Sequence, residues 1–212
     1  MITTSSFKDW DSDFYQTVAI SADGGKKAGF NGKVYKPLAP KKAFWDIWHN
    51  NIGIIPEEEN TYYYVEQYYL QVLSKLDVET VFNDLNYKVL LCYESNQEFC
   101  HRHIVAAWIE LLLGEVVQEG RAKDLYTEKV ERPDYIKPLL ESIMKKHLNM
   151  RGFSCLRALF LFEKGEKLEH LADLIEDENS VRADHYRQSA CYYRCDADDA
   201  EYMYSLENKN RK

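Results

Sequence analysis

The most constraining feature of this 212-residue chain is a short apolar run, Lys88–Tyr93, followed after a turn by a second apolar segment, Phe99–Leu113. The first run is continuous rather than alternating, which is typical of a parallel strand covered on both faces. The second is apolar throughout its later half except for Glu110, which predicts a buried helix. Because Glu115–Gln118 has the pattern of another short strand, this order predicts a βαβ unit and a parallel sheet.

The remaining elements follow from hydrophobic spacing. Met1–Phe7 predicts a short edge strand and Gln16–Ile20 a second strand. The glycine-rich residues 21–33 predict a loop, whose glycine spacing does not match a P-loop. Helical periodicity predicts helices over residues 41–50, 60–76, from 133 onward, and over 153–162, 168–175 and 184–194.

Composition changes near Arg121, where residues 121–132 become polar and mixed in charge. We therefore expect an α/β domain over residues 1–120, a linker over 121–132 and a helical appendage over 133–212. The fold class that this predicts is α/β, with a Rossmann-like, mostly parallel sheet, flanking helices and a C-terminal helical appendage.

The overall charge limits the kinds of partner. Lys plus Arg number 27 against 35 for Asp plus Glu, a formal net charge of -8. This acidic balance argues against broad electrostatic binding to nucleic acid or to an anionic membrane. Residues 1–13 have no apolar signal-peptide core, and five cysteines without such a signal fit a reducing compartment. We expect a cytoplasmic protein.

The turn between the two apolar segments predicts where the buried helix starts. Ser95 followed three residues later by Glu98 matches a capping box, so we expect the helix to begin near Asn96. The cluster Cys100–His103 would then occupy its first two turns, at the carboxyl end of the Lys88–Tyr93 strand. Ligands of open α/β sheets bind beyond the carboxyl ends of the strands. We therefore expect a ligand site at this cluster.

The basic residues of the cluster predict an anion. The positive end of the helix dipole disfavours a cation in the first turn by about 0.3 to 1 kcal/mol. A phosphate or carboxylate bound near His101, Arg102 and His103 would offset that cost. An ion pair of Arg102 with Glu94 or Glu98 would offset it equally, and the sequence leaves that alternative open.

Two stretches of this region, Leu90–Glu94 and Phe99–Trp108, resemble domain-of-unknown-function family 488, which is widespread in bacteria and phages. Val18–Ser21 and Tyr35–Pro40 support the resemblance, which covers roughly residues 1 to 120. It implies a Rossmann-like α/β sheet and no established activity. The motif residues of the family correspond here to Cys92, Glu94, Cys100, His101 and Arg102, and we add Ser21 to the expected ligand-binding residues.

Two of these residues are candidates for catalysis. Cys100, close to a helix N-terminus and beside His and Arg, has the surroundings of a reactive thiolate. It would nevertheless lie inside the helix rather than in an anion-binding loop, and the alternative is a small buried side chain. Glu94 is a candidate nucleophile or weak base, because a nearby Arg would keep it ionised. The alternative for Glu94 is a structural cap or ion pair.

Side chains of the metal-ligand types occur here as well, namely Cys92, Cys100, His101 and His103. His101 and His103 are two residues apart and would face different sides of a helix. The spacing of the set matches no standard zinc motif. A second pair, Cys191 and Cys195, supplies only two ligands. We therefore expect no metal and no cofactor.

The sequence thus predicts binding of a phosphorylated small molecule or nucleotide beyond the Lys88–Tyr93 strand, and it leaves open whether the chain also processes that ligand. The alternative is a non-catalytic bacterial or phage interaction or regulatory protein that binds a protein partner through its helical appendage. A cavity on which Glu94 and Arg102 converge would favour the first hypothesis. A sealed ion pair, with an exposed apolar patch on the appendage, would favour the second.

Overall fold

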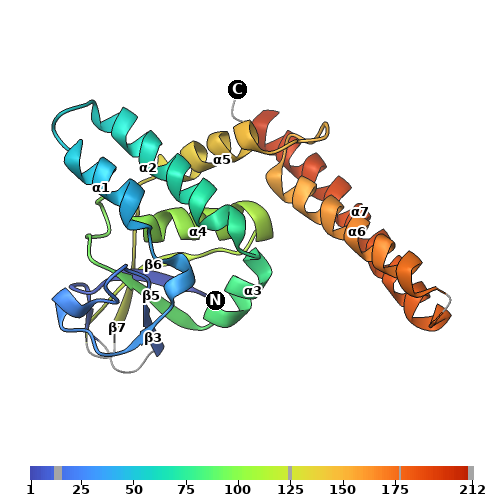
Figure 1. The fold of residues 1–212 in the computed structure, drawn as a ribbon, viewed down its shortest axis with the longest axis horizontal. Helices are drawn as coiled ribbons and strands as arrows, with labels where there is room; N and C mark the ends of the chain where they lie inside the picture. The colour runs from blue at the N-terminus through green and yellow to red at the C-terminus, as the bar shows by residue number, and fades with distance from the viewer. Residues whose placement is uncertain (12–15, 124–125, 177, 210–212) are drawn as a thin grey trace. The chain divides into compact units, whose positions relative to one another are not determined.

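The computed structural model describes residues 1–11, 16–123, 126–176 and 178–209 (Figure 1). Residues 12–15 of the predicted α/β domain, 124–125 of the predicted linker, and 177 and 210–212 of the predicted appendage lie outside the described residues. The chain divides into two compact units, Met1–Lys146 and His147–Lys212. None of the helices in the described part of the chain combines the length and apolar character that a membrane span needs.

The first unit is built on a mostly parallel sheet with flanking helices, which confirms the predicted α/β, Rossmann-like class. The strands lie in the order β4 (Lys33–Val34), β3 (Gln16–Ala19), β5 (Lys88–Cys92), β1 (Thr3–Ser6), β6 (Gln118–Lys123) and β7 (Tyr126–Val130). A short strand, β2 (Trp10–Asp11), also pairs with β6. Only β6 and β7 are antiparallel among the pairs of described strands.

β5 lies in the middle of the sheet, between β1 and β3, as its continuous apolar run predicts. The segment that we expected to be an edge strand, Met1–Phe7, instead contributes β1, which lies between β5 and β6. Its polar side chains are buried and hydrogen-bonded: Thr4 Oγ1 donates to Glu119 Oε2 at 2.5 Å, and Ser5 Oγ to the Gly120 carbonyl at 2.7 Å. These bonds allow a polar strand to occupy an interior position.

Helix α4 (His101–Leu113) connects β5 to β6 and completes the predicted βαβ unit, with β1 between the two strands. It packs on β1 and β5, and Figure 1 shows it between the sheet and α2. Its first nine residues are all buried, which explains its lack of a polar face. The other helices of this unit are α1 (Lys42–Asn50), α2 (Glu57–Gln71), α3 (Val78–Leu85) and α5 (Ile136–His147).

The domain boundary lies elsewhere than the composition suggested. The expected linker, 121–132, contains the end of β6 and all of β7, which pair in the register Gly120 with Lys129. The first unit continues through Lys146 and so includes most of α5. Glu128 and Lys129 are exposed, so the mixed charge of this segment belongs to the solvated side of a hairpin rather than to a linker.

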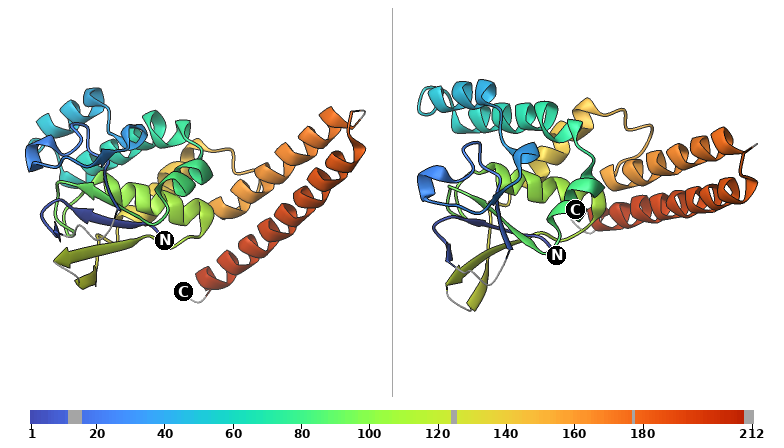
Figure 2. Two further views of the ribbon diagram at one scale, coloured as in Figure 1. Left: turned by 90° about the horizontal axis from the view of Figure 1, so that it is seen from below. Right: turned by 60° about the horizontal axis from the view of Figure 1, so that its bottom comes forward.

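The second unit is a pair of long helices, α6 (Leu156–Ile175) and α7 (Ser180–Lys209), which lie side by side (Figure 2). We expected two helices, over 153–162 and 168–175. The structure has one, α6, which continues through Gly165. A Cβ at Gly165 would lie 3.1 Å from the Ala190 carbonyl oxygen of α7. Buried small residues recur every seven positions on both helices: Ala158, Gly165 and Ala172, and Ala183, Ala190 and Ala197. This spacing lets the two helices approach closely.

A larger side chain at this interface tests the small-residue packing. Ala190→Leu should separate α6 from α7 and lower the local stability of the second unit by about 1 to 3 kcal/mol, because overpacking forces the backbones apart. Hydrogen–deuterium exchange of the amides of α6 and α7 measures this loss. Gln188→Leu adds the same side chain at an exposed position of α7 and should change stability by less than about 0.5 kcal/mol. Equal effects of the two substitutions would contradict the packing described.

Candidate functional site

The carboxyl ends of β3 and β5 meet the start of α4 at one edge of the sheet. β5 ends at Cys92, a turn of residues 93–100 follows, and α4 begins at His101. A cavity of about 590 Å³ lies at this edge. Its lining comes from the loop after β3, from α1 and α2, and from the turn that leads into α4. The cavity therefore lies in the crevice where open α/β sheets bind ligands.

Aromatic side chains form the walls of the cavity. Trp45 and Trp48 come from α1, Tyr64 from α2 and Phe99 from the turn before α4. The Trp48 ring lies 5.1 Å from the Tyr64 ring and 5.8 Å from the Phe99 ring, between centroids. Such walls suit a flat, weakly polar ring, which gains both apolar burial and ring–ring contacts.

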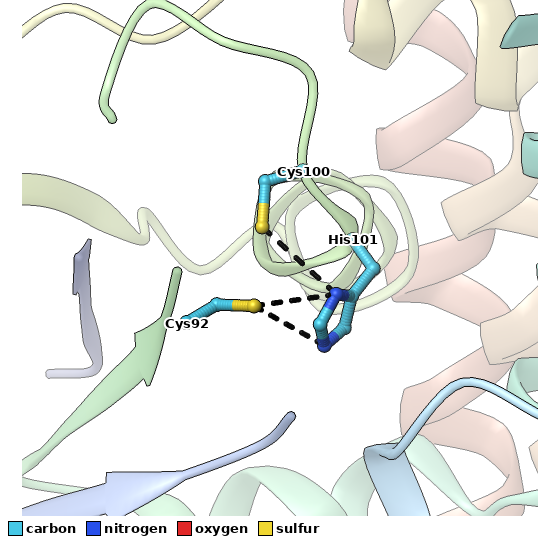
Figure 3. A group of neighbouring side chains, drawn as sticks. All are labelled: Cys92, Cys100 and His101. Atoms are coloured by element: carbon cyan, nitrogen blue, oxygen red, sulfur yellow. Dashed lines mark hydrogen bonds between the residues drawn. The ribbon is translucent and has the colours of Figure 1, made fainter. Parts of the chain in front are cut away.

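Two thiols, a carboxylate and an imidazole lie together on the cavity lining. Cys92 Sγ is 3.6 Å from His101 Nδ1, and Cys100 Sγ is 3.9 Å from the same atom (Figure 3). Glu94 Oε2 lies 2.9 Å from Cys100 Sγ and 3.3 Å from Cys92 Sγ, at hydrogen-bonding distance from each thiol. The strand end thus supplies Cys92 and Glu94, and the helix start supplies Cys100 and His101.

The His101 ring is held in one orientation. Its Nε2 lies 3.1 Å from the carbonyl oxygen of Ile20, just beyond β3. Since a carbonyl only accepts hydrogen bonds, Nε2 carries a proton, and Nδ1 has a free lone pair only when the ring is neutral. The ring also packs against Tyr68 of α2, with centroids 5.6 Å apart. Burial lowers the pKa of His101, but the charges of Cys100 and Glu94 raise it overall. Cys92 Sγ lies 3.6 Å from Nδ1 and 3.9 Å from Nε2, so it lies over the ring rather than on the axis of the Nδ1 lone pair.

The two thiols differ in acidity. Burial raises the pKa of Cys92 well above its usual value, and the neighbouring Cys100 and Glu94 raise it further. Burial would also raise the pKa of Cys100, but the hydrogen bond from Cys92 and the charges of Arg102 and His101 hold it well below its usual value. Cys100 is therefore the thiol that ionises first.

Glu94 differs from the sequence expectation of a carboxylate that Arg102 keeps ionised. Burial, followed by the charge and hydrogen bond of Cys100, raises the pKa of Glu94 to about 7. The guanidinium of Arg102 is paired with Glu119 and donates to the backbone carbonyl of Glu94 rather than to its carboxylate. A carboxyl group of this kind can give or take a proton near neutral pH.

The loop after β3 forms a polar side of the cavity. Ser21 Oγ donates to Asp23 Oδ1 at 3.0 Å and accepts from the Gly25 amide at 2.9 Å. Tyr93 donates its hydroxyl proton to Asp23 Oδ2 at 2.5 Å, which links this loop to the turn after β5. Gly25 has a φ of 80°, and an added Cβ would lie 2.6 Å from the Phe7 ring, so only glycine fits there. Ser21 thus shapes the loop as well as lining the cavity.

Five of the predicted site residues line the cavity: Ser21, Cys92, Glu94, Cys100 and His101. Arg102 and His103 do not, and both side chains have no exposed surface. The Arg102 guanidinium donates to Glu119 Oε1 from Nε at 3.0 Å and from Nη2 at 2.8 Å. His103 Nε2 lies 3.4 Å from Glu119 Oε2.

Arg102 also holds the turn that precedes its own helix. Its Nη1 donates to the Glu94 carbonyl at 2.7 Å, and its Nη2 to the Ser95 carbonyl at 2.8 Å. The expected anion at Arg102 is thus replaced by an internal carboxylate, Glu119, rather than by the expected candidates Glu94 and Glu98. Because every described contact of Arg102 is internal, the residue positions the turn and does not face the cavity.

The start of α4 also corrects the sequence expectation. Ser95 donates its amide proton to Glu98 Oε2 at 2.7 Å, as in one half of a capping box, but the helix begins at His101 rather than near Asn96. Cys100 is the N-cap residue, with extended backbone angles. The objection that Cys100 lies inside a helix therefore does not apply, because its thiol precedes the first turn.

Several cavity residues were absent from the sequence prediction, notably Asp23, Lys27, Trp45 and Trp48. The loop that carries Asp23 and Lys27 follows β3, a strand that the sequence did predict. The sequence did not show that β3 pairs with β5, which brings this loop to the cavity. Trp45 and Trp48, three residues apart on one helix, formed a visible pair, but the sequence does not show what a helix faces.

Comparison of the chain with protein-family models, with curated proteins and with solved structures finds no match in any of the three. The resemblance to domain-of-unknown-function family 488 therefore stays a prediction.

Loss of either partner of the buried ion pair should strongly destabilise the first unit. Arg102→Met or Glu119→Gln should each lower the unfolding free energy by about 3 to 5 kcal/mol, because a buried charge is left without its partner. Urea denaturation measures the loss. Lys42→Ala removes the partner of Asp46 at a position where the lysine side chain is 85% exposed, and should cost less than about 1 kcal/mol. Single losses below about 1 kcal/mol at Arg102 or Glu119 would contradict the pairing.

The raised pKa of Glu94 makes stability depend on pH. A carboxyl group whose folded pKa of about 7 exceeds its unfolded pKa of 4.5 stabilises the fold below the lower value, and this contribution is lost as pH rises through the higher one. Glu94→Gln removes the effect. Between about pH 5 and about pH 8 the unfolding free energy of the variant, relative to the unmodified chain, should rise by about 2 kcal/mol. Urea denaturation at both pH values tests this, and a constant difference would contradict it.

Proposed function

We propose that the chain binds a nucleotide, or a phosphorylated small molecule of similar size with a flat ring, in the cavity at the carboxyl ends of β3 and β5. The observation that carries this proposal is the cavity itself, with a volume of about 590 Å³ and five Trp, Tyr and Phe side chains in its lining. Ligand pockets are typically ~300–1,000 Å³, mostly apolar, with a few polar groups that fix orientation. The aromatic walls would hold the ring.

Two lysines on the cavity lining, Lys27 and Lys42, take the role that the sequence assigned to Arg102. The backbone amide of Lys27 donates to the Tyr93 hydroxyl at 3.1 Å and to Asp23 Oδ2 at 3.2 Å. These hydrogen bonds fix the loop from which the Lys27 side chain extends. Lys42 forms an exposed pair with Asp46. The first turn of α4 contains no acidic residue, so its dipole favours an anion there, against the carboxyl groups of Asp23, Asp46 and Glu94 that also line the cavity.

The cavity lining can also carry chemistry on a bound ligand. Glu94, with a pKa of about 7, is suited to proton transfer near neutral pH. Cys100, at the N-cap of α4 with a lowered pKa, is suited to nucleophilic attack. Processing of the ligand would use Glu94 as the acid or base and Cys100 as the nucleophile.

The interaction-protein hypothesis has two supporting observations. Several large apolar side chains of the second unit are exposed, among them Leu174, Val181 and Tyr192. Arg102 is also sealed in an ion pair, as that hypothesis expects. Glu94, however, faces a cavity with aromatic walls, and nothing in the described residues indicates what would cover the exposed side chains. Small-molecule binding is therefore the function that we propose.

Isothermal titration calorimetry with the four common ribonucleoside 5′-monophosphates tests the proposal. At least one should bind with a Kd below about 1 mM. Its nucleoside should bind more weakly, since it lacks the phosphate. Lys27→Met should weaken the monophosphate about tenfold, near 1.4 kcal/mol, and leave the nucleoside unchanged. Trp45→Ala should weaken both ligands.

Lys75→Met is the matched control, because Lys75 is exposed and lies outside the cavity lining. This substitution should leave every affinity unchanged. Absence of monophosphate binding, or binding that Lys27→Met and Trp45→Ala do not affect, would contradict the proposal.

A further inference from the structure

We infer that Cys92, Cys100 and His101 form a binding site for zinc or a chemically similar divalent ion, with the fourth coordination position directed to the cavity beside Glu94. The inference does not depend on the nucleotide proposed above, since it rests on the three side chains alone. Their ligand atoms all lie within 4.8 Å of one another (Figure 3). With the ion bound, Cys100 is a metal ligand, so the nucleophilic role proposed above applies to the metal-free chain only.

The distances among these atoms fit a tetrahedral centre. With bonds of about 2.3 Å to sulfur and about 2.0 Å to nitrogen, tetrahedral geometry places a sulfur and a nitrogen ligand about 3.5 Å apart. The observed separations from His101 Nδ1 are 3.6 Å to Cys92 Sγ and 3.9 Å to Cys100 Sγ. The separations therefore suit an ion once the Cys92 side chain or the His101 ring turns so that the Nδ1 lone pair points between the two sulfurs.

The orientation of His101 supports metal binding independently of the distances. A metal-bound histidine usually donates its other ring N–H to a carbonyl or carboxylate, which fixes the tautomer. Here Nε2 lies 3.1 Å from the Ile20 carbonyl, which leaves Nδ1 as the nitrogen available to an ion, and Cys92 Sγ lies over the ring at 3.6 Å from Nδ1 and 3.9 Å from Nε2. The ring is buried and packed against Tyr68, so this orientation exists without an ion.

Both thiols lie beside a carboxyl group, that of Glu94. Both lie at hydrogen-bonding distance from Glu94 Oε2, at 2.9 and 3.3 Å. When a metal ion binds, it takes the place of the thiol protons, and these protons are released. Two protein thiolates and one imidazole with an open fourth position are a set found in catalytic zinc sites. Glu94 would then lie beside the group in that position.

From the sequence we considered these three residues as ligands and rejected them, because their spacing matches no zinc motif. The ligands come from two elements. Cys92 ends a strand and Cys100 precedes a helix, so their spacing reflects a βα turn rather than a zinc motif. His103, the other expected ligand type, is directed to Glu119 instead. No other group of three candidate ligand side chains occurs among the residues that the structure describes.

The test is a metal titration of the full-length, reduced, metal-free chain. Zinc, measured in competition with a chromogenic chelator, should bind with a stoichiometry of one ion per chain at this site. Cobalt should give the strong visible absorption of a tetrahedral centre together with thiolate charge-transfer bands. The cobalt spectrum of the unmodified chain needs no variant, so it is informative even if a variant fails to fold.

Substitutions identify the ligands. Cys92→Ser, Cys100→Ser and His101→Ala should each weaken zinc binding at least about 100-fold, since loss of an outer-shell partner alone costs about 10- to 100-fold. Glu94→Gln should keep the stoichiometry. The matched control is the double substitution Cys191→Ser and Cys195→Ser, which removes two exposed cysteines of α7 and should leave this site unchanged.

Three results would overturn the inference. The first is a cobalt spectrum of the unmodified chain without tetrahedral thiolate bands. The second is zinc binding that the Cys92 and His101 substitutions leave intact in folded variants. The third is zinc binding that is lost in the Cys191 and Cys195 control. None of these measurements contains a nucleotide, so failure here is distinguishable from failure of the proposed function.

Discussion

The buried ion pair between Arg102 and Glu119 is the interaction on which the rest of the site depends. A charge without exposed surface is tolerated only where partners satisfy it, and Arg102 reaches a carboxylate on β6 and two carbonyls of the turn after β5. Glu119 in turn accepts from Thr4 of β1. One guanidinium thereby joins α4, two strands and the turn between β5 and α4.

The different roles of the residues between Cys92 and Arg102 follow from the ion pair of Arg102 with Glu119. Because Arg102 binds the backbone carbonyls of Glu94 and Ser95, the turn is held while the Glu94 side chain remains on the cavity lining. The Glu94 carboxylate does not have the guanidinium as its partner, and burial together with the neighbouring Cys100 raises its pKa to about 7. Arg102 is a positioning residue, and in our proposals Cys92, Glu94, Cys100 and His101 carry the chemistry.

The sequence predicted the helices and strands themselves better than it predicted which of them are neighbours in the fold. A continuous apolar run identified β5 as a central strand, and the buried helix after it was evident from its length and composition. The polar segment Thr3–Ser6 was expected at an edge, because the partners that satisfy its hydroxyls lie more than 100 residues away in the chain. For the same reason Glu119 was not foreseen as the partner of Arg102. Contacts between distant segments leave no local signal.

A crystal structure of the zinc-loaded protein, with anomalous difference density recorded at the zinc absorption edge, tests this division of roles most directly. The result we predict is a single strong peak within about 2.0 to 2.4 Å of both sulfurs and of His101 Nδ1. The Arg102 guanidinium should remain against Glu119 in the same map. A map with no peak among Cys92, Cys100 and His101, or with the guanidinium turned into the cavity, would contradict the account.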